Sequence, residues 1–215
     1  MPLGQPPFKA YWKENMPFVI FIAAIFGTGV VFGAVLVSAL TLDMNQELSR
    51  HLGNFFQSVD IGFGSDRSRI FWNIFGLNAK WILLIWLLGL SVVGLPIIFV
   101  MDFLKGALIG FTVSFLAAQY SWKGLLFSLV SVVPQNLVLI PLLIIGSVAG
   151  MSFSIYLVKN RVLQNKGQVL PPFVKYGLLM AVMLILAAGV SLFEAYVSPN
   201  LMGNVTPFLT LGVAD

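Results

Sequence analysis

Cysteine is absent from this chain of 215 residues, and histidine occurs only once, as His51. Without cysteine there can be no disulfide, no thiolate metal site and no cysteine nucleophile. A single histidine cannot complete a hydrolase triad within one chain or provide a two-histidine metal site. The sequence also lacks a nucleophile elbow, a phosphate-binding glycine loop and a zinc-protease motif. We therefore expect a protein that is not an enzyme and has no catalytic residues, no metal and no cofactor.

Charge is also scarce, because only 9% of the residues are charged while 59% are hydrophobic. Soluble domains carry about 25% charged residues, so this chain cannot cover a surface that faces water. It can be stable in a lipid bilayer. The net charge of +4 comes from basic residues that lie between apolar runs and not on one polar face. This arrangement is typical of membrane topology and argues against a nucleic-acid partner.

Five stretches without a charged residue define the candidate spans. A helix needs about 20 apolar residues to cross a hydrocarbon core of ~30 Å. The sequence therefore predicts an all-α, polytopic membrane bundle of about five transmembrane helices, in a single domain over residues 1–215. Asp102 and Lys105 are expected to form a tight cytoplasmic turn between the second and third spans. The five stretches are Asn15–Leu42, Trp81–Met101, Gly106–Trp122, Gly124–Val158 and Tyr176–Phe193.

The fourth stretch is 35 residues long, which is too long for one span and barely enough for two. Proline breaks helices because it lacks the backbone N–H. One interpretation is a short helix that dips into the membrane up to about Val133, a break, and then one span. The alternative is two thin spans, which would give six in total. The amides in the break either cap the helix ends or form a transport site. The broken segment contains Pro134, Gln135, Asn136 and Pro141.

Residues 43–80 form the only sizeable extramembrane segment, and its start resembles a capping box, Asp43 with Gln46. Apolar residues then recur at helical spacing, which predicts an amphipathic helix of about four turns. A second short helix is expected from Ser65 or Asp66. The first helix either lies on the bilayer or binds another protein. Its apolar, candidate partner-binding residues are Leu48, Leu52, Phe55, Phe56 and Val59.

The distribution of basic residues favours a cytoplasmic N-terminus, with seven Lys and Arg inside and five outside. Segment 43–80 is then extracytoplasmic. Small residues recur four apart in several spans, which predicts faces where helix backbones pack closely or grip the membrane helix of a partner. These residues are Gly29 and Gly33, then Gly106, Gly110 and Ser114, then Gly146 and Gly150, and finally Gly177.

The order of these features resembles one known family. A short basic N-terminus and a long first span precede the outer amphipathic segment. The run Asp102-Phe-Leu-Lys105-Gly106, then Pro134-Gln135-Asn136 ahead of Pro141, and Gly146-Ser-Val-Ala-Gly150 follow. This pattern is similar to the stage II sporulation protein M family of spore-forming bacteria over nearly the whole chain. Broader relatives read His-Gly-x-x-Glu-x-Pro around the broken helix, and Gln135, Asn136 and Leu139 replace that pattern here.

The resemblance implies a membrane scaffold of the engulfment machinery, located in the mother-cell membrane at the sporulation septum. Members of the family recruit and stabilise two peptidoglycan hydrolases, the amidase stage II sporulation protein P and the lytic transglycosylase stage II sporulation protein D. The resemblance brings no catalytic residues. The alternative function is a small transporter or channel with its site at residues 134–141, which a polar lining that converges on Asn136 would support.

Overall fold

The computed structural model describes residues 7–60, 67–91, 93–159, 169–199 and 201. In these residues the chain is helical except for short connections such as residues 40–41 and 90–91, which confirms the predicted all-α class. Five of the helices are long and apolar enough to cross a membrane, as the sequence predicted. In chain order the elements are α1 Pro7–Leu36, the 3₁₀ turn η1 Val37–Ala39, α2 Leu42–Asp60, α3 Arg67–Gly89, α4 Gly94–Ser131, α5 Val133–Leu157 and α6 Leu170–Tyr196.

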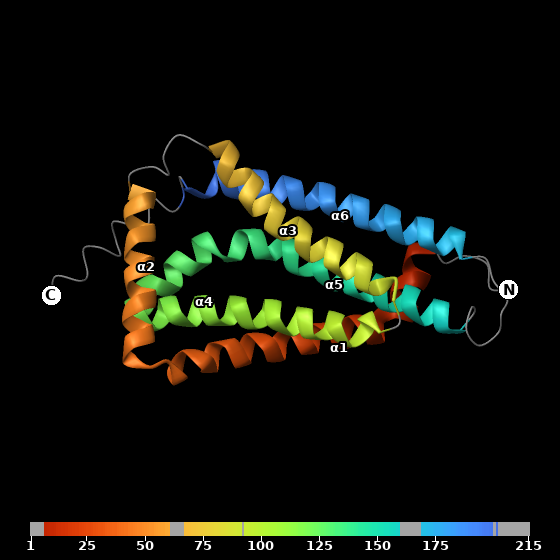
Figure 1. The fold of residues 1–215 in the computed structure, drawn as a ribbon, viewed down its shortest axis with the longest axis horizontal. Coiled ribbons are helices and arrows are strands. Elements are labelled where there is room, and N and C mark those ends of the chain that lie inside the picture. Colours follow the sequence, from red (N-terminus) through yellow and green to blue (C-terminus); the bar gives the residue numbers. More distant parts are fainter. Residues whose placement is uncertain (1–6, 61–66, 92, 160–168, 200, 202–215) are drawn as a thin grey trace.

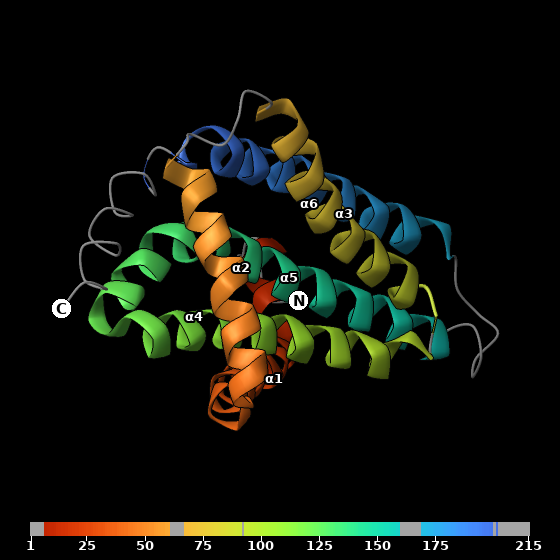
Figure 2. The same ribbon diagram turned by 60° about the vertical axis from the view of Figure 1, so that its left-hand side comes forward.

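The long helices run roughly side by side, and α2 lies across one end of the bundle (Figure 1). Helices α3, α5 and α6 share the largest cluster of buried residues, which includes Ile85, Leu143 and Met183. Helix α1 lies along α4, and a smaller cluster around Ile22 joins it to α5. Figure 2 shows α2 passing in front of α4 and α5 at their shared end.

The turn between the second and third spans is not where the sequence placed it. Helix α3 already begins at Arg67 and ends at Gly89, and α4 begins at Gly94. Asp102 and Lys105 therefore lie inside α4 and form no turn. The predicted short helix near Asp66 is the first part of α3. The prediction was wrong because it assumed that every charge marks the end of a span, whereas Asp102 is buried against another helix.

Gly94, the first residue of α4, permits the actual turn. A Cβ at Gly94 would collide with the backbone carbonyl of Leu88, so this tight reversal requires glycine there. The Ser91 amide donates a hydrogen bond to the Leu88 carbonyl over 3.0 Å, and the Gly94 amide donates one to Ser91 over 3.1 Å. Backbone hydrogen bonding and the absence of a side chain determine this turn, and no charged residue marks it.

Helix α4 reverses direction at Ser121, which has a φ of 50° and a ψ of −133°. Residues 94–120 cross the bundle, and residues 122–131 turn back from the end where α2 lies (Figure 1). A non-glycine residue at positive φ is strained. The following helix α5 then completes a single crossing, as the first interpretation of this stretch predicted, so the two-span alternative is wrong. The break falls at Val132, just before Pro134, and α5 continues through Pro141.

Four glycines bring α1 and α4 into backbone contact. A Cβ at Gly29 or Gly33 would collide with the backbone carbonyl of Phe103 or Ala107 in α4. In return, a Cβ at Gly106 or Gly110 would collide with the carbonyl of Phe26 or Val30 in α1. This reciprocal fit is the close approach that small residues allow in lipid, where no hydrophobic drive between helices exists.

The other predicted small-residue positions differ among themselves. Gly146 contacts the side chain of Met183, and Gly150 lies against Tyr176 and the backbone of Gly89. Ser114 is half-buried. Gly177 has no atom of the described residues near the place of its missing Cβ, so it is not part of a close helix contact within the bundle, and the alternative, contact with a partner's membrane helix, stays a prediction.

The two ends of the bundle differ in their basic residues. The end opposite α2 carries the start of α1, the end of α5 and the start of α6 (Figure 1). Lys105 lies in the bundle interior and therefore no longer counts among the basic residues of the cytoplasmic loops. The remaining basic residues still favour this end as the cytoplasmic side. The topology predicted from the basic residues puts helix α2 on the outer side. In the described residues, the basic residues at the opposite end are Lys9, Lys13, Lys159 and Lys175.

Candidate functional site

The outer helix α2 is attached to the end of α4. The Gln119 side chain donates a hydrogen bond to the Asn45 side chain, and Asn45 is partly buried. Leu48 and Leu52 are also half-buried, so the apolar stripe of α2 faces the bundle in its first half. The side chains of the other predicted partner-binding residues, Phe55, Phe56 and Val59, lie outside the described part of the structure.

A polar groove lies between α3 and α4 with α5 as its floor. The two helices meet near the cytoplasmic end and diverge toward α2 (Figures 1 and 2). The groove contains a cavity of about 180 Å³, and Leu108 and Thr112 form its exposed rim on α4. The residues that line this cavity are Asn78, Lys105, Leu108, Ile109, Thr112, Val132, Gln135, Asn136 and Leu139.

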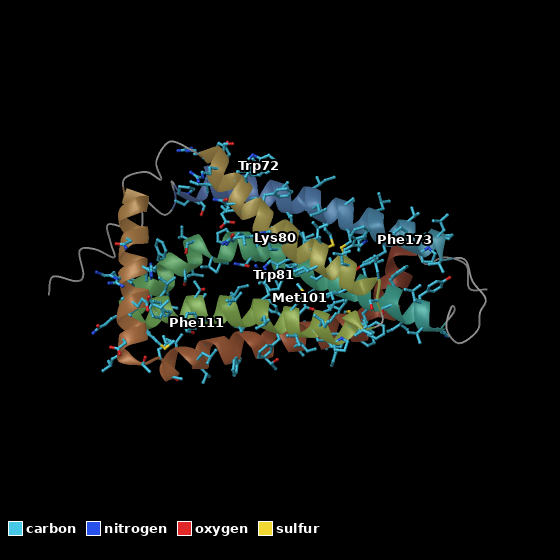
Figure 3. All side chains as sticks on the ribbon, viewed as in Figure 1. Trp72, Lys80, Trp81, Met101, Phe111 and Phe173 are labelled. Atoms are coloured by element: carbon cyan, nitrogen blue, oxygen red, sulfur yellow. The ribbon has the colours of Figure 1, made fainter. Side chains whose placement is uncertain are left out.

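Lys105 is the only ionisable residue among these lining residues. It lies eleven residues beyond the start of α4, about 16 Å along the helix axis. Its Nζ atom lies 5.4 Å from the centre of the Trp81 ring, at a distance that allows a cation–π interaction. Figure 3 shows the side chain of Trp81 between α3 and α4.

A second charged residue balances Lys105 from α6. The Lys105 ammonium and the Glu194 carboxylate interact electrostatically, and Gln135 hydrogen-bonds the same carboxylate. The other carboxylate oxygen, Oε2, is buried and has no hydrogen-bond partner. Nearby, the Asn78 amide donates a hydrogen bond to Ser191 of α6 over 3.3 Å. Polar side chains of four helices therefore meet at one depth.

The amides after the helix break bond to the carbonyls that the break exposes. Asn136 Nδ2 donates to the Val132 carbonyl over 2.7 Å, and Gln135 Nε2 to the Ser131 carbonyl over 3.5 Å. These bonds match the capping interpretation of the polar insertion. Asn136 is 8% exposed and still lines the cavity, so capping and lining are both roles of this segment.

Asp102 forms a separate buried polar site on α4, three residues before Lys105 and against α5. It is 3% exposed and accepts a hydrogen bond from Ser147 of α5 over 3.0 Å. Its second oxygen has no partner. Ionisable residues inside membrane proteins are rare and mostly functional, but here one hydroxyl is the only polar contact of the carboxyl group. In the described residues, no three acidic or histidine side chains come together as a metal site would require.

Sequence reasoning had selected Gln135 and Asn136 but missed Asn78, Trp81, Ser191 and Glu194 as their neighbours. It had placed Lys105 at a turn, whereas Glu194 does lie near the end of its span, two residues before the end of α6. The sequence did not show how far along its helix each of these residues lies. Asn78 and Lys105 lie in the middle of their helices, and only the correct bounds of α3 and α4 reveal this. Once those bounds are known, polar residues at mid-helix mark the site.

The fold and the groove define a multi-pass, all-helical membrane protein with a polar site inside the bundle. A scan of known families matches residues 22–199 to the model of stage II sporulation protein M. Because this match covers most of the chain, the protein belongs to the stage II sporulation protein M family and is a sporulation membrane protein. No curated protein and no solved structure matches the chain.

Proposed function

We propose that this protein is a non-enzymatic scaffold of the engulfment machinery in the mother-cell membrane at the septum. It recruits and stabilises stage II sporulation proteins P and D, and the two hydrolases thin the septal peptidoglycan. The single observation that carries the proposal is the family match over residues 22–199, because family membership connects the chain to sporulation. The fold is compatible with it, since the long helices anchor the protein and α2 offers a surface on the outer side.

The outer surface of α2 is the proposed contact for the soluble parts of the hydrolases. The helix is amphipathic, and its polar side is exposed at Gln46, Glu47 and Arg50. Its predicted apolar partner residues run from Leu48 to Val59. Because Leu48 and Leu52 are half-buried toward the bundle, we place the contact in the second half of the helix, at Phe55 and Phe56.

Co-purification tests the scaffold directly. The protein is expressed with each tagged hydrolase in membranes, solubilised in detergent and isolated through the tag. The wild-type chain should be recovered with the hydrolase, and Phe55→Glu with Phe56→Glu should reduce the recovery at least tenfold. Gln46→Ala, on the exposed polar side of α2, is the control and should have no effect. If the phenylalanine variants bind normally, α2 is not the contact, and if the wild type binds neither hydrolase, the function is wrong.

A second candidate function is transport, since a polar lining converges on Asn136. The cavity also carries Lys105, and ionisable residues inside a membrane bundle often mark the path of a solute or proton. Liposomes that contain only this protein test the candidate. Flux of ions or protons that disappears in Lys105→Met would support transport, whereas liposomes as tight as protein-free ones would exclude it.

A further inference from the structure

The rim of the polar groove is exposed where a membrane protein meets lipid. Leu108 is 56% exposed, and Thr112 next to it is exposed although its hydroxyl bonds only to its own helix, to the Leu108 carbonyl over 2.8 Å. Behind this rim lie the ammonium of Lys105 and the amides of Asn78 and Gln135. Hydrocarbon solvates such groups poorly, so a polar occupant that reaches the cavity would add hydrogen bonds to those that these groups already make within the bundle.

The size and the chemistry of the cavity limit that occupant. A volume of about 180 Å³ holds a few waters or one polar side chain, since a water molecule takes up about 30 Å³ in the liquid. The lining offers one cation together with hydrogen-bonding amides. Glu194 approaches Lys105 but does not line the cavity, so the cavity itself presents the positive member of the pair. An occupant with a carboxylate or a carboxamide is complementary to it.

We propose that the groove between α3 and α4 is the seat of a partner's single transmembrane helix, which inserts one acidic or amide side chain toward Lys105. The exposed rim of α4 at Leu108 and Thr112 is the surface that such a helix would cover. In lipid, helices associate through close packing and interhelical hydrogen bonds. The groove offers the groups that would form such hydrogen bonds. The inference rests on the proposed scaffold function, because it names how the membrane anchor of a recruited hydrolase is held.

Disulfide mapping tests this seat, and the absence of cysteine in the chain makes the mapping specific. Leu108→Cys, at the rim, is combined with single cysteines placed along the membrane anchor of stage II sporulation protein P. Disulfides need Cα atoms about 4.4–6.8 Å apart, so cross-links should recur every three or four anchor positions, on one helix face. Ile185→Cys is the control, because it is 71% exposed on α6, away from the groove. Cross-links without helical periodicity, or equal yields at Ile185→Cys, would overturn the seat.

Variants inside the groove test the chemistry. Lys105→Met should lower the cross-linking yield at Leu108→Cys roughly three- to tenfold, in line with one interhelical hydrogen bond, and Lys105→Arg should restore most of it. Because Lys105→Met also leaves Glu194 without its cation, Thr112→Trp provides an independent block. It fills the cavity from the exposed rim and keeps both charged residues in the chain, and it should produce the same loss. If neither variant changes the yield, the groove does not hold the anchor.

Replacing the anchor of the partner by an unrelated polyleucine helix separates this inference from the scaffold function. Weaker co-purification of the altered hydrolase, by a factor similar to that of Lys105→Met, supports the seat. Full co-purification of the altered hydrolase overturns the seat and leaves the scaffold intact. No co-purification of the natural hydrolase overturns the scaffold itself. Flux through the protein alone that depends on Lys105 would assign the cavity to transport and overturn the seat.

Discussion

The crossing of α1 and α4 predicts a sharp position dependence among the glycines of α1. Gly27 and Gly33 lie in the same helix, less than two turns apart. A Cβ at Gly27 would meet nothing within 4 Å, whereas a Cβ at Gly33 would collide with the carbonyl oxygen of Ala107. The two alanine variants therefore add the same methyl group to the same helix, and only one of them meets backbone atoms.

The cost of Gly33→Ala follows from the rigidity of the atoms that it meets. A backbone carbonyl cannot rotate aside as a side chain can, so α1 and α4 must separate by on the order of 1 Å. A gap of 0.5–1 Å removes about a quarter to a half of the dispersion energy of the affected contacts. Overpacking of this kind costs about 1–3 kcal/mol. Gly27→Ala should be neutral or slightly stabilising, because alanine favours helix by up to about 1 kcal/mol over glycine.

Thermal unfolding of the purified protein in detergent measures the difference. A loss of 1 kcal/mol lowers Tm by about 2–4 °C for a chain of this length, so Gly33→Ala should lie about 2–12 °C below the wild type. Gly110→Ala, on the other side of the same crossing, should behave similarly, and the double variant should lose less than the sum because one separation relieves both collisions. Equal Tm values for Gly27→Ala and Gly33→Ala would refute the reasoning.

Three further predictions follow from particular contacts. Tyr176→Phe should cost about 1 kcal/mol in thermal unfolding, since its hydroxyl donates a hydrogen bond to the Ile85 carbonyl over 3.0 Å; an unchanged Tm would show that this bond is dispensable. Asp102→Asn should leave Tm nearly unchanged because it keeps the acceptor for Ser147, whereas Asp102→Leu should cost about 1–3 kcal/mol by leaving that hydroxyl unpaired; equal losses would contradict this account. A membrane-impermeant thiol reagent outside intact cells should label Met44→Cys on α2 and leave Leu170→Cys at the start of α6 unlabelled, and the reverse pattern would invert the topology.

The composition of the sequence was enough to predict the class of fold, because apolar runs of this length fit only helices in lipid. It also predicted the single crossing after the helix break, since proline and its polar neighbours interrupt a stretch of known length. The bounds of α3 were wrong by about fourteen residues at the start. Its first half was predicted to be a loop because it contains three basic residues, Arg67, Arg69 and Lys80. The helix includes all three.

The wrong bounds of α3 also explain why the polar site was not predicted. Charge patterns in one dimension cannot distinguish a lysine at the end of a span from one inside a bundle, because both interrupt an apolar run. The difference lies in tertiary partners: Lys105 has Trp81 from α3 and Glu194 from α6, and neither is near it in sequence. The glycine ladders, in contrast, depend only on spacing along one helix, which the sequence states directly.

Helix α2 crosses one end of the bundle at a steep angle to the long helices (Figure 2), and its 19 residues measure about 28 Å at 1.5 Å per residue. A helix of this length that lies at one membrane surface occupies headgroup area in one leaflet and none in the other. Such an imbalance makes binding sensitive to membrane curvature. We therefore expect the protein to bind more favourably where the bilayer curves outward on the side of α2. This geometry alone would concentrate it on a membrane that is being bent.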